Sequence, residues 1–475
     1  MNQDTEQNTE KTIRVYVTTD ASGGSEVRFG FPDRSASDDA EEAGASGEDE
    51  QNKRAAEKFA RKSLSEEEAL RKFRQLNYEW KLVALGFFEI VPELSRRNVE
   101  YAGSERTSII LELLRQTSIA SDETELDDGR VDREFSVTFE DFSIIAKALG
   151  RSRPSIRAAR IMARSSLLAL VSEYENFMSE MLRTLVRLKP NTLISDDETV
   201  TVRSLEQFAS YDEFMEDLVD SKVTDLIQAN SHFKLIRWIE EKFGVNLTSD
   251  KQMIGEFVEV FQRRHLLAHA GGVVNRKYLK VCTEHGCTEK TLPSLDERIN
   301  VDRRYLRRAT ARVFMMGYFT LHILWQKVLP KQRDDSVRAI LGASHDFLER
   351  DLTKMCERLC DFVLNSSKPV SARDTAYLAI NKAQSYLFDP EAEEAHRLQR
   401  VEGVLRKYDW TMADAIVELA LCCLRRDFSS LDSKVQRAVA SGLTRHDAMT
   451  WSIFREVRQQ EAFSKHFGIR ALPVS

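Results

Sequence analysis

Proline, glycine and long apolar runs are scarce in this chain of 475 residues. Only 9 prolines and 19 glycines are present, so few residues end helices or form tight turns, and long elements are expected. The longest apolar run, Val313 to Trp325, is too short to cross a bilayer and contains His322. The first residues, MNQDTEQNTEK, lack the apolar stretch of a secretory signal. These absences predict a cytoplasmic protein with no membrane partner.

The six cysteines lack the spacing of a disulfide framework, and a chain of this length needs no crosslinks to fold, so we expect reduced thiols. Cys282, His285 and Cys287 in the sequence CTEHGC have the loose spacing of metal ligands. No second close pair accompanies them, so the spacing leaves zinc as an open alternative, and we predict no metal and no cofactor.

Sequence signatures of several common enzyme classes are also missing. The chain contains no P-loop, no nucleophile elbow and no Rossmann fingerprint, so nothing indicates an NTPase, a hydrolase of that type or a dehydrogenase. The net charge of −7 argues against a protein coated in nucleic acid over its whole surface. The 69 lysines and arginines still permit a local basic groove.

Abundant Leu, Ala, Glu and Arg favour helices, so the predicted fold class is all-α, a helical bundle flanked by further helical regions. Apolar alternation in TIRVYVTT and GSEVRFGFP predicts a small β-hairpin within residues 1–31. Residues 32–54 include a stretch with seven acids and no bases, which predicts an acidic disordered linker.

Helical periodicity begins at residue 55 and divides the rest of the chain into three regions. Residues 55–150 predict an N-terminal helical region with two successive helices, 63–98 and 104–118, and then a mixed linker. Residues 151–330 predict a bundle of about five helices, with a loop between the last two. Residues 331–475 predict a C-terminal helical domain similar to a repeat stack.

Three stretches of this C-terminal domain are each predicted as one helix. The amphipathic pattern predicts single helices over 335–365, 413–439 and 445–468. The loop predicted inside the bundle covers 273–293.

The stretch RRHLLAHAGG, residues 263–272, concentrates charge at the end of a predicted helix. His269 lies in the last turn, where unpaired carbonyls favour an imidazolium, and a histidine can exchange protons near neutral pH. Arg264 offers a planar, permanently charged fork that suits a phosphate. Such a pair is sufficient for metal-free RNA cleavage, because RNA supplies its own 2′-hydroxyl nucleophile.

The sequence RRHLLAHAGGVVNRKYL resembles the signature of the HEPN superfamily of helical ribonucleases, an Arg followed after four to six residues by His. Here Arg264 and His269 match the two ends, and His265 takes the polar place after the Arg. LVSEYENFMSEMLR is similar to the first long helix of that group, and YLAINKAQSYLF and WSIFREVR look like segments appended to such proteins. The resemblance implies a metal-independent endoribonuclease, a toxin or anti-phage defence effector of bacterial abortive-infection type.

We therefore predict Arg264, His269 and His265 as catalytic residues. Basic and polar side chains near them are predicted to bind RNA: Arg263, Asn275, Lys277, Arg303, Arg304, Arg307 and Arg308. Glu175 on the long helix either holds a histidine or arginine of the site in place or is a surface acid.

Alternatives remain open for the motif. Arg264 and His269 are about 140° out of phase on an ideal helix, whereas His265 and His269 share a face, so a metal clip or a structural role is possible. The predicted partners are an RNA substrate, a second copy in a homodimer or higher oligomer that supplies a second Arg and His, and an antitoxin or sensor. The alternative function is a non-catalytic helical scaffold or RNA-binding regulator.

Overall fold

The structure is a computed structural model, and it forms two compact units, Met1–Ala60 and Arg61–Ser475, which are described separately. The described residues are 14–19, 25–30, 64–117, 120–125, 131–136, 153–189, 208–229 and 231–469, with single positions at 138, 143, 144, 147 and 192. The predicted acidic linker, 32–54, lies outside them.

In the first unit, β1 (Arg14–Thr19) pairs antiparallel with β2 (Ser25–Gly30). In the register, Val15 lies opposite Phe29 and Val17 opposite Val27. This is the pairing that the alternating pattern of residues 1–31 predicts.

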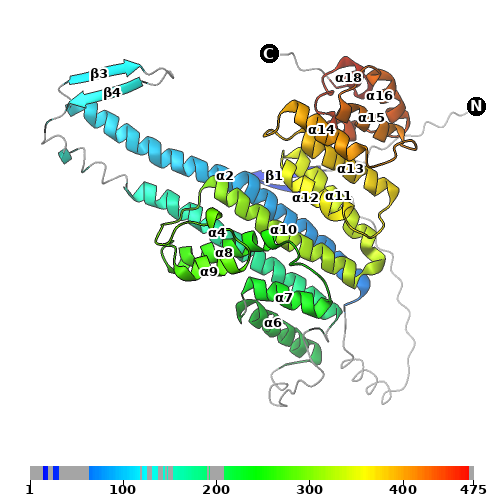
Figure 1. Ribbon diagram of the computed structural model, residues 1–475, viewed down its shortest axis with the longest axis horizontal. Helices are drawn as coiled ribbons and strands as arrows, with labels where there is room; N and C mark the ends of the chain where they lie inside the picture. Colours follow the sequence, from blue (N-terminus) through cyan, green and yellow to red (C-terminus); the bar gives the residue numbers. More distant parts are fainter. Residues whose placement is uncertain are drawn as a thin grey trace, which may run out of the picture. The chain divides into compact units, whose positions relative to one another are not determined.

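The second unit is built from helices, which confirms the predicted all-α class (Figure 1). Its long helices are α2 (Glu66–Thr117), α4 (Arg153–Leu188), α6 (Tyr211–Ala229), α8 (Lys251–His269) and α10 (Arg303–Val328). Two shorter ones, α7 (His232–Phe243) and α9 (Arg276–Glu284), lie between them in the chain. Within the described residues, no helix is both long enough and apolar enough to cross a membrane.

Helix α2 runs without a break where the sequence predicts two helices. It begins as expected, with a capping box in which the Glu68 amide donates to Ser65 Oγ and the Ser65 amide donates to Glu68 Oε2. The predicted break between residues 98 and 104 contains one glycine and no proline, and a single glycine costs a helix only about 1 kcal/mol. The mixed linker predicted next is also wrong in part, because β3 (Ala120–Glu125) and β4 (Val131–Ser136) form a second hairpin there.

Helix α2 packs along α4 and α10 and so belongs to the bundle core (Figure 1). The Trp80 ring stacks on Phe177 at 4.6 Å between centroids, and its Nε1 donates to the Phe314 carbonyl at 3.1 Å. Gly317 makes this fit possible, since a Cβ there would lie 2.9 Å from Trp80 Nε1. The region boundary expected at residue 150 therefore does not separate two cores.

Each of the three helices predicted over 335–365, 413–439 and 445–468 is interrupted. Asp351 and Arg426 adopt left-handed backbone angles, with φ of 54° and 55°, which end one helix and re-aim the chain. The resulting elements are α11 (Arg333–Glu349), α12 (Thr353–Leu364), α15 (Ala415–Arg425), α16 (Leu431–Ala440), α17 (Arg445–Thr450) and α18 (Glu461–Phe467). Amphipathic periodicity continues across such breaks, which is why the pattern does not reveal them.

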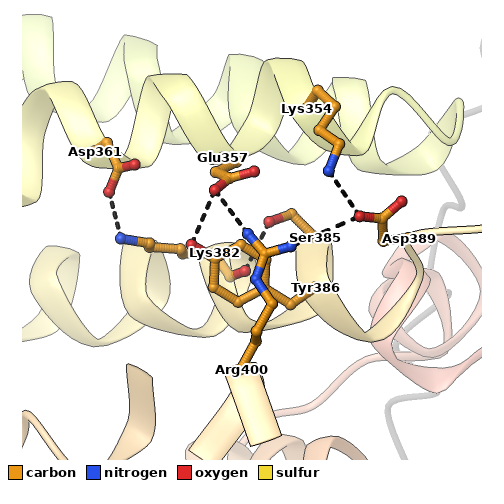
Figure 2. A network of polar contacts seen from close by, with 8 residues as sticks. All are labelled: Lys354, Glu357, Asp361, Lys382, Ser385, Tyr386, Asp389 and Arg400. Atoms are coloured by element: carbon orange, nitrogen blue, oxygen red, sulfur yellow. Dashed lines mark hydrogen bonds and ion pairs between the residues drawn. The ribbon is translucent and has the colours of Figure 1, made fainter. Parts of the chain in front are cut away.

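Helix α13 (Ala372–Leu387) joins the bundle core to a second apolar core formed by the helices that follow. Leu378 belongs to the first core, and Ala379 and Ala383 belong to the second. Polar side chains fasten α13 to α12 and to α14 (Glu394–Leu405), as Figure 2 shows. Glu357 on α12 accepts from Tyr386 on α13 and from Arg400 on α14, both at 3.0 Å.

Candidate functional site

The end of α8, which carries the RRHLLAH sequence, is fixed by a glycine pair and by an arginine from α4. The amides of Ala270 and Gly272 both donate to the Leu266 carbonyl, at 2.8 and 2.9 Å. Gly271 and Gly272 have positive φ angles of 59° and 80°, which other residues rarely adopt. Arg164 donates to the Leu267 carbonyl at 2.5 Å, where the helix end is partly negative.

Arg263 points into the protein rather than toward a ligand. Its Nε donates to the buried Glu259 carboxylate at 2.7 Å, and its guanidinium lies 3.8 Å from the centre of the Tyr305 ring. Burial disfavours the charge, but Tyr305 and Glu259 outweigh this effect and raise the pKa of Arg263. Tyr278 and Tyr305 also donate to Glu259, each at 2.8 Å. The Arg263 side chain thus joins α8, α9 and α10, and the predicted contact of this residue with RNA gains no support from its position.

Arg264, the next residue, lines a cleft of about 490 Å³. Four helices contribute polar side chains to the cleft: Glu175 from α4, His232 from α7, Arg264 and His265 from α8, and Lys277 from α9. The Nε atom of Arg264 is buried and has no hydrogen-bond partner within the part of the chain that the structure describes. A buried guanidinium nitrogen without a partner is costly unless a ligand accepts its hydrogen bond.

Glu175 holds His232 in place on the opposite wall. The carboxylate oxygen lies 3.0 Å from His232 Nε2, and the imidazole stacks on Phe261 with 3.8 Å between ring centroids. The bond to His232 lowers the pKa of Glu175, against the effect of burial, and the nearby charge of Arg264 lowers it further. Glu175 therefore takes the holding role that was one of its two interpretations.

Sequence reasoning missed His232 altogether. It lies in the first turn of α7, which Ser231 caps by accepting from the Lys234 amide at 3.3 Å. A histidine directly after a capping serine is a local signal, but its distance of more than 30 residues from the motif concealed the connection. Only the packing of α7 on α8 brings it beside Arg264.

The two histidines of the motif share a face of α8, as the four-residue spacing predicts. Their ring centroids lie 4.9 Å apart. Burial lowers the pKa of His265, and the positive charges of His269, Lys277 and Arg264 act in the same direction. His269 is exposed and is not among the residues that line the cleft, so one chain does not bring Arg264 and His269 together there.

The other predicted residues fall into three groups. Lys277 lines the cleft. Asn275 instead caps α9, since its side chain accepts from the Tyr278 amide at 2.9 Å. The loop predicted over 273–293 therefore contains a helix. The four predicted RNA-binding arginines of α10 line another cleft that shares no lining residue with this one: Arg303, Arg304, Arg307 and Arg308.

The CTEHGC segment uses its side chains to join the α9 region to α8. Cys287 Sγ donates to the Gly255 carbonyl at 3.1 Å, and His285 Nδ1 donates to the Val281 carbonyl at 2.7 Å. Across the described residues, the ligand atoms of Cys282, His285 and Cys287 do not gather within 4.8 Å of one another. The structure therefore gives these three residues no common ligand geometry.

Comparison with known proteins adds no family assignment. No family model, no curated protein and no solved structure matches the chain. What the site can do rests on its own chemistry, which combines two imidazoles, a guanidinium with an unused donor, an ammonium and one carboxylate that orients an imidazole.

Proposed function

We propose that the cleft around Arg264 cleaves RNA without a metal, through attack of the 2′-hydroxyl on the adjacent phosphate. The observation that carries this proposal is the buried Arg264 Nε, which lacks a partner within the described residues, on a residue that lines one cleft with the imidazoles of His232 and His265. A phosphate oxygen is the acceptor that best fits a guanidinium fork. Cleavage products carry a 2′,3′-cyclic phosphate, and DNA, which lacks the 2′-hydroxyl, is inert.

The two imidazoles divide the proton transfers. His265, with a lowered pKa, is the neutral ring that accepts the 2′-hydroxyl proton. His232, oriented by Glu175 at 3.0 Å, delivers a proton to the leaving 5′-oxygen. Arg264 and Lys277 stabilise the charge that develops on the phosphorane. In this proposal Glu175 is a positioning residue, because it acts through His232.

A homodimer remains part of the proposal in a modified form. His269 is exposed at the end of α8 and lies outside the cleft of its own chain. In a two-fold pair it would be available to the neighbouring copy, as the resemblance to HEPN ribonucleases implies. The mass in solution, measured with activity at the same concentrations, tests this step: full activity of a monomer removes any need for the second copy.

The test of the proposed function compares purified full-length wild type with Arg264→Ala, His232→Ala, His265→Ala and His269→Ala in EDTA. The matched control is His396→Ala, which removes an exposed histidine from α14. We expect Arg264→Ala, His232→Ala and His265→Ala each to lower the cleavage rate by at least about 100-fold, the loss that is usual for a general acid or base. The control should keep wild-type activity.

The result that overturns the proposal is a wild type that cleaves only with added Mg²⁺ or Mn²⁺, or that does not cleave at all. RNA binding without turnover, lost in Arg264→Ala, would instead support the alternative of a non-catalytic RNA-binding protein. The defence or toxin role rests only on the sequence resemblance, and growth arrest on expression of wild type but not of Arg264→Ala tests it.

A further inference from the structure

A second cleft, outside the Arg264 site, lies at the start of α10 and has a volume of about 620 Å³. Its cationic rim consists of Arg303, Arg304, Arg307 and Arg308, all exposed. None of these four side chains forms an ion pair with another residue of the described chain. Arg312, one turn further along α10, differs in this respect, since it pairs with Glu256 at 3.2 Å.

The position of these arginines on α10 is electrostatically unfavourable for the free protein. They form two i,i+4 pairs of like charge, 303 with 307 and 304 with 308, and such pairs destabilise a helix. They also lie in the first two turns, which contain no acidic residue, at a helix end that is partly positive and is capped by the Asp302 carboxylate, which accepts from the Tyr305 amide at 2.6 Å. A bound anion would relieve both effects.

A second helix directs its positive end to the same cleft. Thr353 and Lys354, in the first turn of α12, line it, and no side chain caps the start of this helix. Unpaired amides at a helix start are ready donors for a phosphate. The uncapped start of α12, together with four α10 arginines that form no ion pair within the described residues, therefore favours an anionic ligand in one place.

The Lys354 side chain is held at the cleft by a buried carboxylate. Asp389, 3% exposed, accepts from Lys354 Nζ at 2.7 Å and lies 3.7 Å from Arg400 Nη1 (Figure 2). Lys354 and Arg400 lower the pKa of Asp389, against the effect of burial. Asp389 is thus already neutralised. Asp351 and Glu391 also line the cleft; Asp351 pairs with Arg455 at 2.6 Å, and within the described residues neither acid forms an ion pair with the α10 arginines.

The cleft also has an apolar floor, which distinguishes it from a surface that only follows a nucleic-acid backbone. Phe88, Leu352 and Met355 line it and are each under 10% exposed, and Ala311 adds a small side chain on α10. A ligand that fills such a site needs a flat or apolar part as well as anionic groups.

We infer that this cleft is a nucleotide-binding site, separate from the proposed RNA-cleaving site. The phosphates lie among the arginines of α10 and the first turn of α12, and the base lies on the floor beside Phe88 and Met355. This assigns Arg303, Arg304, Arg307 and Arg308 to a small phosphorylated ligand instead of the long RNA strand expected from the sequence.

The experiment measures ATP binding to the full-length protein by calorimetry in EDTA. We expect one ATP per chain and a loss of affinity of about 100-fold in Arg304→Glu/Arg308→Glu, roughly tenfold for each lost charge-assisted hydrogen bond. The control, Arg358→Glu/Arg445→Glu, makes the same charge change at two exposed arginines outside the cleft and should bind like wild type.

A third variant tests the floor. Ala311→Phe should fill the space for the base, weakening ATP binding while inorganic triphosphate binds as before. Equal loss for both probes, or no loss for ATP, would overturn the placement of the base.

Two results overturn the site as a whole. One is the absence of ATP binding, or ATP binding that Arg304→Glu/Arg308→Glu leaves intact. The other is tight binding of a single-stranded oligodeoxynucleotide that depends on Arg304 and Arg308 while ATP does not compete, which would make the arginines a strand-binding surface. Neither result depends on RNA cleavage, because ATP binding is measured directly and the DNA probe lacks the 2′-hydroxyl.

Discussion

Protonation of a single buried histidine should make the bundle sensitive to mild acid. His322 is fully buried on α10, with Nε2 3.1 Å from Asn77 Oδ1 and Nδ1 2.9 Å from Ser336 Oγ. Gln326 Nε2 donates to the same Ser336 oxygen at 3.0 Å. When the ring is neutral and its proton is on Nε2, it donates to Asn77 Oδ1, and Ser336 donates to Nδ1 while accepting from Gln326. All four side chains then have their hydrogen bonds. A second ring proton would leave the serine hydroxyl proton without an acceptor.

The magnitude follows from the pKa shift. Burial lowers the pKa of His322 from 6.5 to about 3. The unfolded chain therefore binds a proton below about pH 6.5 that the folded chain refuses until about pH 3, so the free energy of unfolding falls as the pH falls through this window. At about 1.4 kcal/mol per pH unit, the loss between about pH 6 and about pH 4.5 is about 2 kcal/mol from this one residue.

The assay is urea unfolding at both pH values for wild type, His322→Gln and His396→Gln. The glutamine at 322 cannot titrate, so it should show about 2 kcal/mol less acid destabilisation than wild type, whatever stability it loses at neutral pH. The exposed His396 serves as the control and should leave the acid sensitivity unchanged. The same pH dependence in His322→Gln and wild type would refute the assignment of a neutral, acid-sensitive His322.

Three further changes test the packing and the site. Gly317→Ala places a Cβ 2.9 Å from Trp80 Nε1 and should lower the free energy of unfolding by about 1–3 kcal/mol. The control is Gly342→Ala, which should not lower it, because a Cβ there has nothing within 4 Å. Urea denaturation measures both. Glu259→Ala should lower the free energy of unfolding by about 3–5 kcal/mol, because it leaves the Arg263 charge buried and without its partner. A smaller loss of stability in Glu259→Leu/Arg263→Met than in the single variant would identify that charge as the cause. If the proposed function holds, Glu175→Gln should reduce kcat for RNA cleavage and shift its pH profile with little change in KM, and an unaltered profile would refute the positioning role.

Apolar periodicity and capping residues predict most of the helices, because these signals are local. Ser65 and Asp302 cap α2 and α10, and the glycine pair after His269 ends α8. The breaks at Asp351 and Arg426 were not predictable from periodicity, since they depend on the left-handed backbone of one residue and leave the apolar pattern intact. The α2 helix shows the opposite error, since the break predicted between residues 98 and 104 is absent.

The candidate site shows a different limit of sequence reasoning. Adjacent residues on a helix point about 100° apart, so Arg263 and Arg264 face different surroundings although the sequence presents them as a pair. One stacks on Tyr305 and pairs with Glu259 inside the protein, and the other reaches a cleft. The direction of each depends on which side of α8 is covered by α9 and α10, and that is set by the tertiary fold.

The same reasoning explains why the motif alone does not specify a site. Four residues of helix place His265 and His269 on one face, 4.9 Å apart between ring centroids, but that spacing cannot turn His269 toward Arg264. The second imidazole of the cleft instead comes from His232, which α7 supplies and which Glu175 of α4 orients. A pattern of the form Arg-x4-His therefore predicts where phosphate chemistry is concentrated on the chain, while the proton-transfer partner has to be found in the packing around it. The cleavage rates of His232→Ala and His269→Ala decide between these two partners, because of the two only His232 lines the Arg264 cleft within one chain.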